Sequence, residues 1–233
     1  MEPEIFWSGM AIGAICDVSW LVAYVLLIRR NFQDKACGMP MVALCGNLSW
    51  ETMCAFIHLT DPSIFTDTAH FHVNHIYQVY FCVLWLLVDF VILYQFLKFG
   101  KQHFQKMDDR FFQPVFWSTL AITFFTFFCF DYEFRNWGGN YYENYTGFGH
   151  NLLMSVLFIW MLLERQNLDG QSIYIALFKG IGSLTAGIAV HLLFPPSLFL
   201  DYLYFVILLF DIVYIVMVYR KSQEMGISPW QRV

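Results

Sequence analysis

The sequence has 233 residues, of which 58% are hydrophobic, 20% aromatic and only 13% charged. Soluble domains carry about 25% charged residues, so this composition excludes a protein that faces water on all sides. The net charge of −5 lies mostly between the apolar stretches. No basic segment interleaved with aromatic residues indicates nucleic-acid binding.

Long apolar stretches alternate with short polar segments, which is typical of a polytopic helical membrane protein. Each stretch is close to the roughly 20 residues that a helix needs to cross a bilayer. We therefore predict an all-α integral membrane bundle of seven transmembrane helices in a single domain, residues 1–233. The predicted spans are 7–28, 38–59, 74–97, 114–131, 148–164, 173–194 and 198–219. Pro114 and Pro195-Pro196 mark span boundaries in this prediction.

The basic residues predict the orientation. On this assignment, all but one of the 13 Lys and Arg residues lie on one side of the membrane, and Arg135 is the exception. The positive-inside rule then places the N-terminus outside or in the lumen and the C-terminus in the cytosol. The first stretch follows two glutamates and has no basic n-region, so we expect a retained helix rather than a signal peptide.

Four acids lie near the middle of predicted spans: Asp17, Glu51, Asp89 and Asp211. A charged side chain at a helix centre costs about 2.5–3.5 kcal/mol on insertion scales, and desolvation there favours the neutral form of a carboxyl group. A neutral carboxylic acid in an apolar cavity is a good proton donor. The alternative for each acid is a structural hydrogen bond to a neighbouring helix.

Residues three, four or seven positions apart share a helix face. In four spans such a face combines an acid with amide, imidazole or aromatic side chains. The faces are Asp17/Trp20/Tyr24, Asn47/Glu51/His58, His75/Gln78/Cys82/Trp85/Asp89 and Tyr204/Asp211/Tyr214. They predict either a polar interior that holds the helices together or a cavity with an acid and aromatic walls. Aromatic faces stabilise desolvated cations by roughly 2 kcal/mol or more, so the second interpretation suits a carbocation.

Other patterns are weaker. A stripe of Gly180, Ser183, Gly187 and His191 in the sixth span predicts close helix packing. Asn144-Tyr145-Thr146 is a glycosylation sequon in a predicted lumenal loop. Trp137, Tyr141, Tyr142 and Tyr145 in the same loop predict an aromatic belt or a lid.

The sequence lacks the residues that several other kinds of site require. The pair Asp108-Asp109 is the nearest approach to a magnesium–diphosphate site, but it lies in a basic loop and is interpreted as solvated. Ionisation of an allylic diphosphate by a metal is therefore not expected. The last span has no lysine for a retinal Schiff base. The six cysteines have no paired spacing, so we interpret them as apolar fillers.

The segment Asn47-Leu48-Ser49-Trp50-Glu51 resembles the N-x-x-W-E signature of the small fungal membrane terpene cyclases. These include the paxilline-type indole-diterpene cyclases and the pyripyropene-type meroterpenoid cyclases, with relatives in bacteria. The resemblance runs along most of the chain. Its other matches are Trp20-x-x-x-Tyr24, Leu84-Trp85-Leu86-Leu87-Val88-Asp89, Gly182-Ser183 and Asp211-x-x-Tyr214.

The resemblance implies a proton-initiated cyclisation without metal or redox cofactor. Glu51 and Asp211 would be the catalytic acids, sharing a proton, with Glu51 as the donor to a terminal epoxide or alkene. The substrate would be a hydrophobic prenylated aromatic or polyketide compound that enters from the lipid bilayer. The substrate-binding residues would be Trp20, Tyr24, Asn47, Trp50, Trp85, Asp89 and Tyr214. The membrane would be the endoplasmic reticulum in a fungus or the inner membrane in a bacterium.

The alternative is a protein that is not an enzyme. Acids within spans are common proton-relay elements, so a proton-coupled transporter or a seven-helix receptor fits the same residues. Transporters often show paired repeats and broken helices, and the sequence shows neither. A scaffold with purely structural acids is the third interpretation.

Overall fold

The computed structural model describes residues 2–60, 71–134 and 142–232. These residues form α-helices and short 3₁₀ helices, with no β-strand among them. The helices are α1 (Pro3–Asp34), α2 (Met41–Thr60), α4 (Phe71–Phe99), η1 (Gly100–His103), α5 (Asp109–Phe134), α6 (Tyr142–Arg165), α7 (Ile173–Leu193), α8 (Leu198–Glu224) and η3 (Pro229–Gln231). The all-α prediction is therefore confirmed for the described chain.

Each predicted span corresponds to one α-helix. Within the described residues, six helices are long and apolar enough to cross a membrane, and α2 is the predicted span outside that set. A multi-pass membrane protein is thus supported. The prediction that a span begins at Pro114 is wrong, because α5 begins at Asp109 and continues through this proline. Pro114 removes one intrahelical hydrogen bond without ending the helix.

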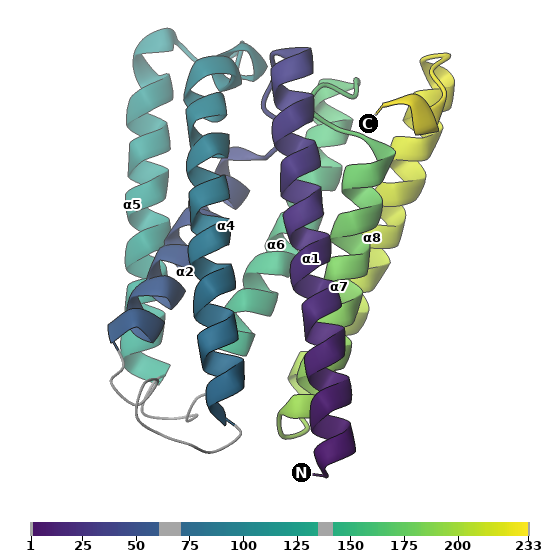
Figure 1. The fold of residues 1–233 in the computed structure, drawn as a ribbon. Helices are drawn as coiled ribbons and strands as arrows, with labels where there is room; N and C mark the ends of the chain where they lie inside the picture. Colours follow the sequence, from purple (N-terminus) through teal and green to yellow (C-terminus); the bar gives the residue numbers. More distant parts are fainter. Residues whose placement is uncertain (1, 61–70, 135–141, 233) are drawn as a thin grey trace.

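The helices form a bundle with two sides (Figure 1). On one side α1 packs against α7, and α7 against α8; on the other α2 packs against α4 and α5. Helix α6 contacts both α8 and α2, so it joins the two sides. The two termini lie at opposite ends of the bundle (Figure 1). This arrangement leaves a space between α1 and α7 and the helices α2, α4 and α6.

The small residues of α7 face large neighbours, as the predicted packing stripe requires. A Cβ atom on Gly187 would lie 3.0 Å from the Tyr204 ring of α8, and one on Gly180 would lie 3.3 Å from Ile215 Cδ1. Ser183 accepts a hydrogen bond of 3.0 Å from Asn151 Nδ2 of α6. His191, at the exposed end of the stripe, pairs with Asp201 at 2.9 Å.

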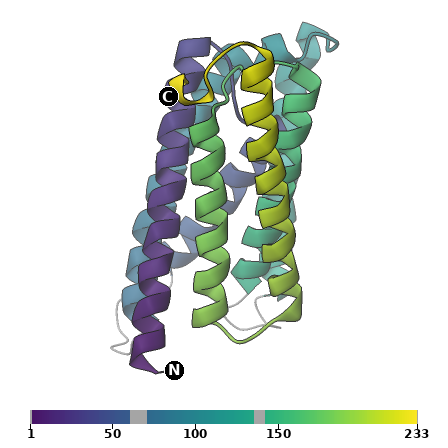
Figure 2. The same cartoon turned by 90° about the vertical axis from the view of Figure 1, so that its right-hand side faces the viewer.

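The C-terminal segment crosses the end of the bundle from α8 towards α1 (Figure 2). Arg232 Nη2 donates to Asp34 Oδ2 and to the Leu168 carbonyl, both at 2.7 Å. Asp34 also accepts from Arg30 at 2.6 Å. The ends of α1, α6 and α8 are therefore tied together on this side of the bundle.

Two loops meet at the same end with almost no space between them. A Cβ atom on Gly38 would lie 1.9 Å from the carbonyl oxygen of Gly170. The Gly38 N–H donates to Asn31 Oδ1 at 2.6 Å, and Asn31 Nδ2 donates to Gln95 Oε1 at 2.9 Å. Only glycine at position 38 permits this backbone approach, because the obstructing atom is itself backbone.

We expect Gly38→Ala to lower the free energy of unfolding by about 1–3 kcal/mol or more, the usual cost of overpacking. Thermal unfolding in detergent measures the change. Gly149→Ala is the matched control, because a Cβ atom there meets nothing within 4 Å. Equal midpoints for the two variants would show that the loops move apart without cost.

Candidate functional site

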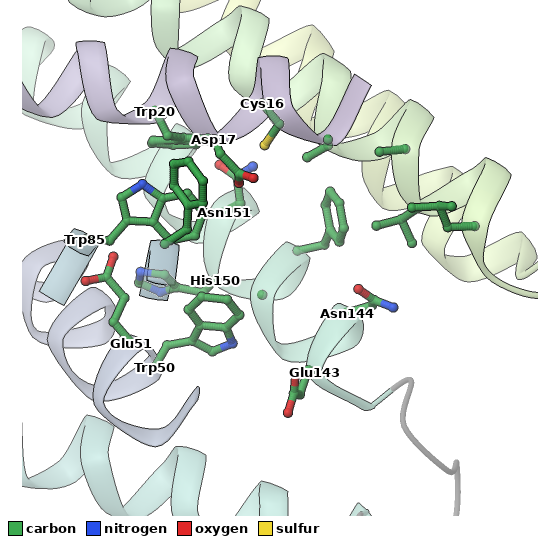
Figure 3. A pocket seen from close by; sticks show the side chains of 18 of the residues that line it. Cys16, Asp17, Trp20, Trp50, Glu51, Trp85, Glu143, Asn144, His150 and Asn151 are labelled. Carbon is green, nitrogen blue, oxygen red and sulfur yellow. The ribbon is translucent and has the colours of Figure 1, made fainter. Parts of the chain in front are cut away.

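A cavity of about 230 Å³ lies between α1 and α7 on one side and α2, α4 and α6 on the other. Its surface is mostly apolar, as in typical small-molecule sites, with acidic, amide and imidazole side chains among the lining residues. Glu51, Trp50 and Trp85 lie on one side of the close-up view, and Glu143 and Asn144 lie towards the other (Figure 3). Asp17 of α1 also lines the cavity.

Three tryptophans provide the aromatic wall: Trp20 from α1, Trp50 from α2 and Trp85 from α4. Small residues of other helices make room for two of them. A Cβ atom on Gly182 would lie 2.6 Å from Trp20 Cδ1, and one on Gly147 would lie 3.1 Å from Trp50 Cζ2. The Trp50 indole N–H donates to Thr146 Oγ1 at 3.1 Å, which fixes the ring.

Glu51 is the acid at this wall. Its side chain is only 3% exposed, and Oε1 accepts a hydrogen bond of 3.4 Å from the Tyr24 hydroxyl. Among the described residues, Glu51 Oε2 and the Trp85 indole N–H, both buried, have no hydrogen-bonding partner. Buried polar groups are normally satisfied, so these two atoms are exceptions, and both belong to residues that line the cavity.

The Asp89 carboxyl is fully buried and interacts with that of Glu51. Two carboxyls together in an apolar interior are disfavoured as a pair of anions. Asp89 is not among the described residues that line the cavity, whereas Glu51 is.

A chain of buried polar side chains continues from Glu51. Asn47 Nδ2 donates to the Tyr24 hydroxyl, and Asn47 Oδ1 lies 2.7 Å from His150 Nε2. His150 fits against α2 because residue 46 is glycine: a Cβ atom there would lie 2.2 Å from His150 Cε1. The chain holds the Tyr24 hydroxyl on Glu51.

Asp211 is not among the described residues that line the cavity. Its Oδ1 accepts from Lys179 Nζ at 2.5 Å and from Ser155 Oγ at 2.8 Å. Tyr214 is not among those lining residues either. Tyr214 packs on Phe158 and donates to Gln171 Oε1 at 3.0 Å.

The structure therefore places some of the predicted site residues at the cavity and others away from it. Those at the cavity are Trp20, Tyr24, Asn47, Trp50, Glu51 and Trp85. The acid beside Glu51 is Asp89, whereas Asp211 is paired with Lys179, so proton sharing between Glu51 and Asp211 is not what the geometry favours. Lys179 is 2% exposed and lies in the interior of the bundle.

Sequence reasoning missed the contribution of α6, which brings His150, Asn151 and Met154 to the cavity. A His-Asn pair inside an apolar span was the available signal. Asn144, expected in a lumenal loop as a sequon, lies on α6 and lines the cavity. Trp137 and Tyr141, and the side chains of His58, His75 and Gln78, lie outside the described residues.

No group of three His, Cys, Asp or Glu side chains suited to a metal ion occurs within the described part of the chain. Asp108 and Asp109 are exposed and pair with Arg110 and Lys101, which agrees with the solvated interpretation.

Fold and site together define a multi-pass helical membrane protein whose apolar cavity combines a buried acid with aromatic walls. The profile of the Pyr4-like transmembrane terpene cyclases matches residues 3–224, and the chain belongs to this family.

Among its relatives is the Pyr4-family terpene cyclase mfmH of Annulohypoxylon moriforme, 28% identical over 192 residues, which cover 79% of this chain and 72% of mfmH. Another is the terpene cyclase esdpB of Penicillium shearii, 31% identical over 99 residues, 42% of this chain and 35% of esdpB. A third is the asnovolin H synthase nvfL of Aspergillus novofumigatus, 27% identical over 94 residues, 39% of this chain and 32% of nvfL. The chain thus spans about a third of the length of esdpB and of nvfL.

We expect Tyr24→Phe to lower the free energy of unfolding by about 1–3 kcal/mol, because it leaves buried Asn47 and Glu51 atoms without a partner. Thermal unfolding in detergent measures it. Tyr94→Phe is the control, since Tyr94 is 53% exposed and its hydroxyl accepts from the Lys98 ammonium in an exposed contact. Similar midpoints for both variants would contradict a buried hydrogen-bond chain.

Proposed function

We propose that this protein is a terpene cyclase that protonates the terminal epoxide, or alkene, of a prenylated aromatic or polyketide substrate and drives its cyclisation in meroterpenoid biosynthesis. The observation that carries the proposal is the Glu51 carboxyl: buried on the cavity wall beside three tryptophans, with Oε2 free of hydrogen bonds to the described residues. Membership of the Pyr4-like family supports the reaction class.

In the proposed reaction, Glu51 gives its proton to the epoxide oxygen, the C–O bond breaks and a tertiary cation forms. Alkenes of the same chain attack in turn, each closing a ring and moving the positive charge. Loss of a proton from carbon to a base ends the cascade, so the product is an isomer of the substrate. No oxidant or reductant is consumed.

The cavity suits each step. The Trp85 indole N–H, which lacks an acceptor among the described residues, is placed to donate to the oxygen of an epoxide or of the alcohol that it becomes. The faces of Trp20, Trp50 and Trp85 stabilise the cations. The apolar lining folds the chain and excludes water, which would otherwise quench the cation.

Two further acids support Glu51 in this proposal. Asp89 shares the pair with Glu51 and so helps it to hold a proton before substrate binds. Asp211, the second acid of the family pattern, is also required, and its ion pair with Lys179 adjoins Trp20.

We propose further that α2 crosses the bilayer with the other six helices, with the N-terminus in the lumen and the C-terminus in the cytosol. The termini at opposite ends of the bundle support an odd number of spans (Figure 1). In a fungal host the membrane is that of the endoplasmic reticulum. The hydrophobic substrate reaches the cavity from within the bilayer.

We expect Glu51→Gln to lower conversion by roughly 100-fold or more, the usual contribution of a general acid. Membranes containing the protein are incubated with epoxidised farnesyl and geranylgeranyl aromatic compounds, and cyclic isomers of unchanged mass are measured. Glu164→Gln on α6 is the control, because Glu164 is exposed and 3.8 Å from Lys106.

A folded Glu51→Gln variant that cyclises at the rate of the wild type would contradict the assignment of the donor. A folded wild type that leaves every such substrate linear would contradict the cyclase proposal. The test of the alternative is then substrate-dependent proton uptake, and its loss in Glu51→Gln would favour a transporter.

A further inference from the structure

Asp211 of α8 is not among the described residues that line the cavity, although the resemblance to the membrane terpene cyclases implies that it is a catalytic acid. Asp211 is 1% exposed and Lys179, its partner on α7, is 2% exposed. Ser155 of α6 bridges them: Lys179 Nζ donates to Ser155 Oγ at 2.6 Å, and Ser155 donates to Asp211 Oδ1 at 2.8 Å. The three side chains join α6, α7 and α8 in one buried group.

This group adjoins two residues that line the cavity, Trp20 and Asn151: Ser155 Oγ lies 3.0 Å from the Asn151 carbonyl oxygen. The Lys179 ammonium lies 5.6 Å from the centroid of the Trp20 ring. Trp20 lines the cavity, whereas Lys179, Ser155 and Asp211 are not among the described lining residues. Because Gly182 leaves room for the Trp20 ring at 2.6 Å, the indole is held between α7 and the cavity.

The charge of Lys179 matters for any cation in that cavity. Charges interact strongly across a low-dielectric interior, and a lone ammonium beside Trp20 would oppose a carbocation near the same ring. Asp211 cancels that charge at 2.5 Å. Replacing a buried ion pair by neutral groups is often tolerated, whereas removing one partner leaves an uncompensated charge.

Building on the proposed cyclase function, we infer that Lys179 and Asp211 are positioning residues of the reaction. Their pair holds Trp20 and keeps this side of the cavity electrically neutral, so that Asp211 acts through Lys179 and not on the substrate. Lys179 thereby has a role in the reaction, and Asp211 acts as its counter-ion instead of as a proton donor.

The test compares Asp211→Asn, Lys179→Met and the double variant Lys179→Met/Asp211→Asn in the conversion assay, at equal amounts of folded protein. We expect Asp211→Asn to lower kcat by roughly tenfold or more with little change in KM. We expect the double variant to recover most of that loss, because no uncompensated charge remains. A purely structural role would not restore kcat in this way. Asp201→Asn, which alters an exposed pair on α8, is the control.

A folded double variant as inactive as Asp211→Asn would overturn the inference, because Asp211 would then act as an acid in its own right. Full activity of Asp211→Asn would overturn it as well. If Asp211→Asn does not fold, the double variant alone decides by its activity. Lys179→Met/Asp211→Leu repeats the test, and failure of both double variants to fold would contradict a replaceable pair.

Thermal unfolding separates this inference from the proposed function. If the wild type makes no cyclic isomer, the cyclase proposal fails. The ion pair between Lys179 and Asp211 still predicts that the double variant unfolds at a higher temperature than Asp211→Asn. The reverse order of midpoints would contradict the pairing independently of any activity.

Discussion

Charge is costly inside an apolar helical bundle, and the structure places its buried acids in two different electrostatic settings. Glu51 and Asp89 lie together as two carboxyls that are disfavoured as a pair of anions. Asp211 instead has a cation, Lys179, at 2.5 Å. The first arrangement brings two acids together, one of them at the cavity wall, and the second pairs an acid with a base outside the described cavity lining. Two acids of the same family pattern thereby have opposite chemical characters.

The aromatic wall depends on small residues of facing helices. Trp20 fits against Gly182, Trp50 against Gly147, and His150 against Gly46. In each pair a side chain on one helix occupies the space that a Cβ atom on another helix would take. Each ring therefore packs closely against the backbone of a glycine on the facing helix. Because a glycine has no side chain that could move aside, this packing fixes the position of the ring. The Gly-Ser of α7 has a site role as well as a packing role, since Gly182 holds Trp20 and Ser183 bonds Asn151, which lines the cavity.

Helix periodicity was sufficient to find the helices and the polar faces, and the motif on α2 located Glu51 and Trp50 at the cavity. Periodicity specifies which face of a helix is polar, but not which helix lies opposite that face. Asp211 and Tyr214 share the polar face of α8, yet that face meets Lys179, Gln171 and Phe158 rather than the cavity. The burial of Lys179 likewise depends on the partner that α8 supplies, Asp211, which periodicity within α7 does not reveal. His150 was missed because its partner, Asn47, is distant in sequence.

Proton donation by Glu51 also requires that the carboxylate left behind be tolerated in the same apolar site. The Tyr24 hydroxyl donates to Glu51 Oε1, and Asn47 holds that hydroxyl in place. Charge-assisted hydrogen bonds are stronger than neutral ones, so this contact stabilises the carboxylate more than the acid. In the proposed mechanism, this contact lets the site tolerate the Glu51 carboxylate during the cascade. The same residue is therefore suited to accept the proton released at the end of the cascade.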